Sequence, residues 1–269
     1  MKLDERMKQY EYVTRNYLTC RMPVIIRLDG KAFHTFTKGM NKPFDNILVD
    51  TMQDTMLELC KNISGCKFGY TQSDEISLLL LDTDTTETQP WFGNNLSKLL
   101  SVTASMATLY FNKYFQANLS EKVLLDEKFN SLPYESKIDT ALFDCRAFNI
   151  PIEEVNNYFI WRQQDCIRNS IQMVAQANFS HKELQNLNCN QLIEKMRNNK
   201  IDYETVFPIY LKRGTCAYKQ QITYTQTQYG SANGYRYTQK ISRNTWCIDE
   251  QMPDLIIEKT FIKEKITND

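Results

Sequence analysis

Two acidic clusters, about forty-five residues apart, stand beside apolar runs of the chain. Asp29 closely follows the run 24–26, and the cluster Ser73-Asp74-Glu75 precedes the run 76–81. If these runs are neighbouring strands, Asp29 and Asp74 meet. Two carboxylates ~4 Å apart repel by roughly 4 kcal/mol at an effective dielectric of about 20. Such a pair must share a proton or bind a cation.

Oxygen ligands alone favour Mg²⁺, and Mg²⁺ at such sites usually brings substrate phosphates with it. The two clusters therefore predict metal-dependent phosphoryl or nucleotidyl transfer. Each cluster by itself also fits an ordinary turn, and only the pair favours a metal site. Gly30 would let the backbone approach a triphosphate closely, and the amides of residues 30–34, at the start of a helical turn, would favour an anion.

Two further polar sets have helical spacing. Lys98, Ser101 and Ser105 share one helix face, where a cation and hydroxyls could hold phosphate oxygens; a solvated polar stripe is the alternative. The second set is Arg146, Arg162, Asp165, Arg168 and Asn169. Three of its members fall at i, i+3 and i+7, and a structural Arg–Asp pair explains them equally well.

A basic set lies near the C-terminus, among several tyrosines. Its members are Lys212, Arg213, Lys219, Arg236, Lys240 and Arg243. Bases and phosphates could dock there, although such charges often form only a solvated face.

The composition is that of an ordinary globular protein, with 42% hydrophobic and 24% charged residues. Lys plus Arg equals Asp plus Glu at 32 each, which argues against a simple nucleic-acid coat protein. We expect neither a secretory signal nor a membrane span, and read the eight cysteines as reduced thiols of a cytoplasmic protein. Two histidines leave little room for a His-rich metal site.

The pattern of the first half predicts strand, helix, hairpin, helix and strand. Helices are expected over 4–19, 43–63 and 95–117, and strands over 22–29, 66–71, 75–82 and 144–150. This order resembles a βαββαβ unit, an antiparallel sheet with helices on one face. The predicted fold class is therefore α+β, similar to a polymerase palm and ferredoxin-like in topology.

The second half predicts helices over 152–177 and 181–197 and then a long β-hairpin. Its strands are 215–227 and 235–248, with Gly-rich residues 230–234 between them. The polar stretch 118–140 is read as a linker. We therefore expect a catalytic region over 5–133 and a C-terminal region over 138–269.

Six separated blocks resemble the tRNA-His guanylyltransferase family of 3′–5′ polymerases, across about residues 5–220. They are Arg27–His34, Pro43–Asp45, Gln72–Ser77, Ser97-Lys98 with Ser101 and Ser105, Phe143–Arg146, and Trp161–Cys166.

The resemblance implies a palm-like sheet and two Mg²⁺ ions, held by Asp29, Asp74 and the Gly30 carbonyl. It makes Glu75 a further essential carboxylate beside the catalytic Asp29 and Asp74. It implies nucleotide binding by the segment Asp29, Gly30, Lys31, Ala32, Phe33 and His34, and by Ser73, Asp74 and Lys98. The implied partners are tRNA, GTP, ATP and other NTPs, and the implied assembly is a homotetramer. Contacts with tRNA are expected from Arg146, Arg162, Arg168, Asn169 and Arg213.

One block departs from the pattern of enzymes that add a single G to tRNA-His. Those enzymes carry His-Ile-Asn-Asn after Asp-Cys, whereas this chain has Ile-Arg-Asn-Ser at 167–170. The departure resembles the guanylyltransferase-like proteins, which repair truncated tRNA 5′ ends against a template. Non-templated G addition to tRNA-His is the alternative within the family.

Two hypotheses lie outside this activity. A nucleotide cyclase shares the palm logic, but diguanylate cyclases need Gly-Gly where this chain has Gln72-Ser73. A tRNA-binding protein with an inactive site is the other, and the presence of Asp29, Asp74 and Glu75 argues against it.

Overall fold

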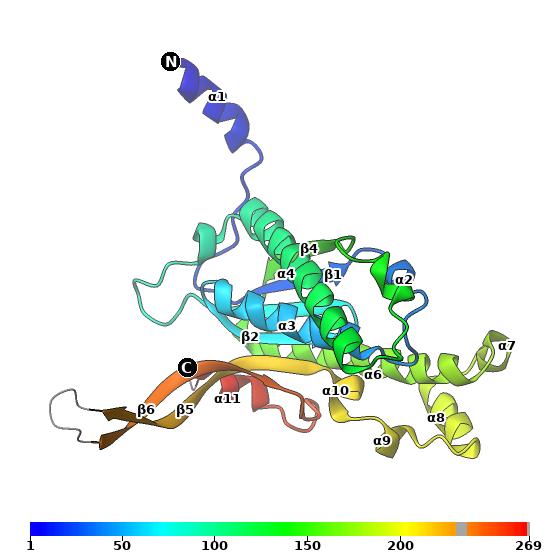
Figure 1. Cartoon of the computed structure of the whole chain (residues 1–269). Coiled ribbons are helices and arrows are strands. Elements are labelled where there is room, and N and C mark those ends of the chain that lie inside the picture. Colours follow the sequence, from blue (N-terminus) through cyan, green and yellow to red (C-terminus); the bar gives the residue numbers. More distant parts are fainter. Residues whose placement is uncertain (230–235, 268–269) are drawn as a thin grey trace.

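A six-stranded antiparallel sheet forms the centre of the computed structural model, which describes residues 1–229 and 236–267 (Figure 1). Its strand order is β4-β1-β3-β2-β5-β6. The strands are β1 Val24–Gly30, β2 Cys66–Gln72, β3 Glu75–Leu80, β4 Phe143–Asn149, β5 Thr215–Tyr229 and β6 Arg236–Asp249. The first four strands, with a helix after β1 and another after β3, form the predicted βαββαβ unit. The α+β prediction is confirmed.

Two long helices cover one face of this sheet (Figure 1). They are α3 Asn46–Asn62 and α4 Leu96–Leu125. The Asp45 carboxylate accepts from the amide of Leu48, and Asn95 caps α4 in the same way. Because side chains alternate along a strand, Ile26 and Leu28 of β1 face these helices and are fully buried with them.

The opposite face is covered by C-terminal elements. These are α6 Val155–Asn178 and α11 Phe261–Thr267. Ile25 and Leu79 point to this side and join a second core. The rings of Phe68 and Phe159 meet edge to face at 5.0 Å within it. The sheet is therefore the middle of three layers, and β1 is buried from both sides.

Short helices complete the chain. They are α2 Phe33–Phe36, η1 Trp91–Asn94, α5 Leu132–Glu135, η2 Ile152–Glu154, α7 His181–Leu184, α8 Cys189–Asn198, α9 Tyr203–Val206 and α10 Ile209–Arg213. The helix predicted over 181–197 is divided into α7 and α8. Asn186 between them takes a left-handed φ of 63°, and Asn188 begins the next helix by accepting from the amide of Gln191.

The terminal hairpin extends the same sheet. β5 pairs with β2 over 215–218 and with β6 over 216–229, so most of the hairpin leaves the body as a two-stranded ribbon (Figure 1). The predicted hairpin is present, whereas its turn over 230–234 and the side chain of Arg236 lie outside the described residues. One sheet thus spans both predicted regions, 5–133 and 138–269, and their division stays a prediction.

The N-terminal helix differs from its prediction. α1 Leu3–Tyr12 has no buried residue and stands away from the sheet (Figure 1). The chain then becomes extended, because the amide of Leu18 donates to the carbonyl of Asn94. The predicted helix end at 19 is therefore wrong. No helix within residues 1–229 and 236–267 is long and apolar enough to cross a membrane.

Candidate active site

The turn between β2 and β3 carries the second acidic cluster to the first. Ser73 and Asp74 form this two-residue turn, with Ser73 in the left-handed region at φ 51°. The turn rests on the end of β1, where the amide of Gly30 donates to the carbonyl oxygen of Asp74 over 3.0 Å. Asp29, the preceding residue, lies opposite Glu75 in the β1–β3 register. The two clusters therefore meet in the structure.

The surroundings of Asp74 disfavour its negative charge. Burial raises the pKa of its carboxyl above the ordinary value, and the neighbouring charge of Asp29 raises it further. No arginine or lysine forms a salt bridge with either carboxylate within the described part of the chain. A divalent cation would relieve both effects, since it supplies positive charge and oxygen-binding capacity at once.

Glu75 is adjacent to Asp74 but has a protein cation beside it. Arg162 of α6 donates from Nη1 to the Glu75 carboxylate over 2.6 Å, and its Nη2 lies 3.4 Å from Asp165. Burial raises the pKa of Glu75, and the charge of Arg162 opposes this. Ser77 reaches the same carboxylate at 3.4 Å and shares a 2.7 Å hydrogen bond with Tyr158.

The same network includes an indole ring. The Arg162 guanidinium lies 3.8 Å from the ring centroid of Trp161. Trp161 itself is 50% exposed to solvent. Arg27 of β1 lies 5.7 Å from the same ring. Trp161 therefore covers a buried cation that was predicted from the sequence either to contact tRNA or to form a structural pair with an aspartate.

Asp144 is a further carboxylate at this edge that sequence reasoning did not single out. It pairs with Asp29 in the β1–β4 register and makes a 3.5 Å salt bridge with Arg146. The signal available was its position at the start of the last palm strand. No cluster of three or more potential metal-ligating side chains is found among the described residues, so backbone oxygens and substrate would have to complete a cation site.

The segment after Asp29 is shaped by packing. A Cβ on Gly30 would lie 2.3 Å from the Phe33 ring, so only glycine fits beneath it. Phe33 is buried and stacks on Phe36 at 4.8 Å. Ala32 has a left-handed φ of 56°. The amides of Gly30 and Lys31 donate to backbone carbonyls, which leaves those at the start of α2 for an anion.

A cavity of about 470 Å³ adjoins the acidic edge. Its walls come from α2, from the 40–45 loop and from α6. Four predicted nucleotide-binding residues line it: Phe33, His34, Ser73 and Asp74. Asn169, predicted to contact tRNA, lines it as well. The structure thus gathers these residues around a space the size of a small-molecule ligand site.

Lys98 is not among the residues lining this cavity. It lies in the first turn of α4, where its amide donates to Asn95 and its ammonium lies 5.7 Å from the Phe92 ring. Thr108 of α4 lies nearer the end of β1, because its hydroxyl accepts from the amide of Phe143, the β4 residue opposite Gly30. Ten residues of helix, roughly 15 Å, separate Lys98 from it.

The predicted tRNA contacts fall in different environments. Arg146 and Arg168 have half-exposed side chains, and Arg168 pairs with Asp165. Arg213 ends α10, and its carbonyl accepts from Tyr70. Arg162 is only 5% exposed. Its guanidinium is held by Glu75 and is not presented to RNA.

Known proteins resemble this chain in both sequence and fold. The family described as tRNAHis guanylyltransferase matches residues 4–151, more than half of the chain. The chain belongs to the tRNA-His guanylyltransferase family. Membership confirms the predicted resemblance and makes the chain a nucleotidyltransferase.

Individual relatives cover more of the chain. A tRNA(His) guanylyltransferase of Debaryomyces hansenii is 26% identical over 97% of this chain and 96% of its own length. A bacterial tRNA(His) guanylyltransferase-like protein, solved in complex with ATP, is 39% identical with a TM-score of 0.79 and full coverage of both chains. A structure described in the same words but with GTP is 36% identical, with a TM-score of 0.72 and coverage of 98% and 99%.

Proposed function

We propose that this nucleotidyltransferase adds nucleotides to tRNA 5′ ends in the 3′–5′ direction and restores missing ones against a template. The observation that carries the proposal is the docking of the Ser73-Asp74 turn on Gly30, which joins Asp29 and Asp74 beside the 470 Å³ cavity. Membership of the tRNA-His guanylyltransferase family gives the substrate class, and the similar structures with ATP and GTP support nucleotide binding.

Two Mg²⁺ ions are part of this proposal. Asp29 and Asp74 would hold them, with the Gly30 carbonyl. The fit rests on two neighbouring carboxylates that form no salt bridge with a basic side chain in the described part of the chain. Bound Mg²⁺ supplies Lewis-acid stabilisation of phosphate oxygens and lowers the pKa of an attacking hydroxyl. Residues 31–34 and Ser73 would hold the triphosphate, whereas Lys98 at the start of α4 lies away from this cavity and is not part of the proposal.

The proposed chemistry has two steps on one 5′ end. ATP first transfers AMP to a 5′-monophosphate, and pyrophosphate leaves. The 3′-hydroxyl of an incoming GTP, or of another NTP, then attacks the activated 5′-phosphate and expels AMP. A tRNA that already bears a 5′-triphosphate loses pyrophosphate directly. The cavity walls would exclude water, which would otherwise hydrolyse the activated end.

Template dependence is supported by the Ile-Arg-Asn-Ser segment at 167–170 and by the similarity to guanylyltransferase-like proteins. Asn169 of this segment lines the cavity, where it could contact the tRNA end. Arg146, Arg168 and Arg213 are proposed as further tRNA contacts, a homotetramer as the assembly and the cytoplasm as the location.

A 5′-extension assay with Mg²⁺ and all four NTPs tests the proposal. Intact tRNA-His and a tRNA lacking its first nucleotide are offered separately. We expect that only the truncated tRNA is extended, and that the added nucleotide is complementary to the opposite strand. A single G on intact tRNA-His, whatever the template, would replace repair by non-templated addition.

The rival activities have their own controls. Incubation with GTP in the absence of RNA should give no cyclic nucleotide. A cyclase would form that product, because it needs no RNA substrate. Mg²⁺-dependent GTP binding should be measurable, and its absence would favour an inactive tRNA-binding protein.

A further inference from the structure

One wall of the nucleotide-sized cavity is a loop. Residues 40–45 lie between α2 and α3 and form neither a helix nor a strand, and all of them except Phe44 line the cavity. A segment without regular structure keeps its position only where contacts to the rest of the fold hold it. The contacts that hold this loop therefore affect the shape of the nucleotide site.

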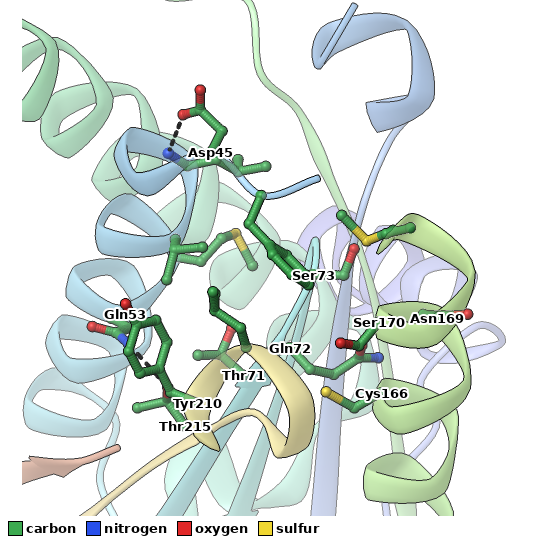
Figure 2. Close-up of a pocket in the computed structure, with 16 residues that line it drawn as sticks. Asp45, Gln53, Thr71, Gln72, Ser73, Cys166, Asn169, Ser170, Tyr210 and Thr215 are labelled. Atoms are coloured by element: carbon green, nitrogen blue, oxygen red, sulfur yellow. Dashed lines mark hydrogen bonds between the residues drawn. The ribbon is translucent and has the colours of Figure 1, made fainter. Parts of the chain in front are cut away.

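Asp45, the last residue of the loop, is the point at which the loop is held. The residue is 5% exposed, and its carboxylate accepts three hydrogen bonds. The amides of Asn41 and Leu48 each donate over 3.0 Å, and the hydroxyl of Tyr134 donates over 2.5 Å. Figure 2 shows Asp45 at the start of α3, with its hydrogen bond to the amide of Leu48. A carboxylate buried to this extent depends on such donors.

Tyr134 differs from the other two donors, because it comes from a separate part of the chain. It lies in α5, 89 residues from Asp45 in the sequence. Among the described residues, it is the only hydrogen-bond partner of residues 38–45 that is more than ten positions away. α5 also lies against the chain just before the loop, since a Cβ on Gly39 would be 3.4 Å from the Cβ of Pro133. Tyr134 therefore ties the loop to α5.

Tyr134 is itself firmly placed. It is 2% exposed, belongs to the core that α3 and α4 share with the sheet, and has its ring centroid 5.1 Å from that of Phe129. Burial raises the pKa of its hydroxyl, and the hydrogen bond to the Asp45 carboxylate raises it further, so the hydroxyl stays a donor at neutral pH. Tyr134 does not line the cavity, so any effect on a nucleotide there passes through Asp45.

We propose that Tyr134 is a positioning residue for nucleotide binding, which acts through Asp45 by holding the 40–45 loop in place as a wall of the cavity. The inference rests on the proposed function, since that function places a nucleotide in the cavity, and it gives α5 a role at the site. Without the hydroxyl, the loop would keep only hydrogen bonds within its own stretch of chain. A nucleotide would then have to order the loop on binding, which costs affinity.

A matched pair of variants, Tyr134→Phe and Tyr114→Phe, tests the inference. Each removes one phenolic oxygen that donates to a carboxylate, and each keeps the aromatic ring. Tyr114 of α4 donates to Glu58 of α3 over 3.2 Å, and neither of these residues lines the cavity. Circular dichroism and thermal unfolding first establish that both variants are folded at the assay temperature.

Two measurements are then made on each protein. Equilibrium binding of ATP and of GTP is measured with Mg²⁺ and without tRNA. The kcat and KM for the incoming nucleotide are measured on a truncated tRNA that bears a 5′-triphosphate, because this end needs no activation by ATP.

Tyr134→Phe should weaken ATP and GTP binding and raise KM by about fivefold to tenfold, because binding must now also order the loop. Its kcat should stay within about twofold of wild type, because a bound nucleotide still meets Asp29 and Asp74 in their usual places. Tyr114→Phe should lower the melting temperature but leave binding, KM and kcat unchanged. A tyrosine that only supports the fold would lower the melting temperature without changing KM.

Three outcomes would overturn the inference. Wild-type KM and affinity in Tyr134→Phe would mean that the loop holds its position without the hydroxyl. An equal rise in KM for both variants would mean that any loosening of the helices weakens binding. A loss of kcat at unchanged KM would place the effect on the chemistry and not on binding. In all three cases normal extension by the wild-type protein leaves the proposed function intact, whereas a wild-type protein that binds neither ATP nor GTP would overturn the proposed function together with the inference.

Discussion

Asp74 and Glu75 are consecutive residues at one turn, and their charges meet opposite surroundings. Burial raises the pKa of both carboxyls, and at Asp74 the neighbouring charge of Asp29 raises it further. Glu75 is 8% exposed and is neutralised by Arg162 at 2.6 Å. The comparison separates two situations: no basic side chain among the described residues pairs with the half-buried Asp74, which we propose to bind an external cation, whereas the buried Glu75 ties the sheet to α6.

The largest expected effect comes from removing the open charges. Asp29→Asn or Asp74→Asn should reduce nucleotide addition by about 10³-fold, since transition-state charge stabilisation is lost. Single-turnover extension of truncated tRNA measures this. Circular dichroism should show an unchanged fold, and turnover near wild type in either variant would contradict the cation assignment.

Breaking the Glu75–Arg162 pair should mainly lower the stability of the fold. Arg162→Met alone leaves Glu75 buried without a partner and should lower the free energy of unfolding by about 3–5 kcal/mol. Adding Glu75→Gln should restore most of this loss, because a neutral pair needs no counter-charge. Urea unfolding of both variants is the measurement. A double variant as unstable as the single one would show that Arg162 acts through packing against Trp161.

The Asp29–Asp74 pair should make the stability of the protein depend on Mg²⁺, whereas the Glu75–Arg162 pair should not. In EDTA, Asp74→Asn should be about 1 kcal/mol more stable than wild type, because a repulsive charge is removed. Mg²⁺ should raise the melting temperature of wild type and leave that of Asp74→Asn nearly unchanged. Thermal scans with and without Mg²⁺ test both statements, and an equal Mg²⁺ response in the two proteins would refute them.

The smallest effect is expected from the Ser77–Tyr158 hydrogen bond, which adjoins Glu75. Tyr158→Phe removes the 2.7 Å hydrogen bond to Ser77 and should cost about 1 kcal/mol of stability. Nucleotide addition should stay within about threefold of wild type, since Arg162 still holds the carboxylate. A large loss of activity would mean that the whole hydrogen-bond network, and not the ion pair alone, positions the Ser73-Asp74 turn.

The sequence predicted the meeting of Asp29 and Asp74 because apolar runs ending in acidic turns report strands and their ends directly. It could not decide which face of a helix is buried. Arg162, Asp165 and Asn169 share a face by spacing, yet only the packed structure shows Arg162 beneath Trp161 and Asn169 in the cavity. Charged residues are usually exposed, so a buried guanidinium runs against the pattern.

The sequence also could not show which end of a helix lies near the site. Helical spacing grouped Lys98 with Ser101 and Ser105 but did not say which end of the helix approaches the acidic edge. Long-range hydrogen bonds decide this, as Asn112 of α4 does by binding the backbone of Ala141.

The position of Trp161 has a practical consequence. Its ring stacks on the cation that holds Glu75, while half of its surface meets solvent. The chain has three tryptophans; Trp91 stacks on Phe92 in η1 and Trp246 lies on the terminal hairpin. With those two replaced by phenylalanine, the emission of a single indole would become an optical reporter placed beside the acidic edge. The protein thus carries its own probe for following, in real time, when that edge is filled.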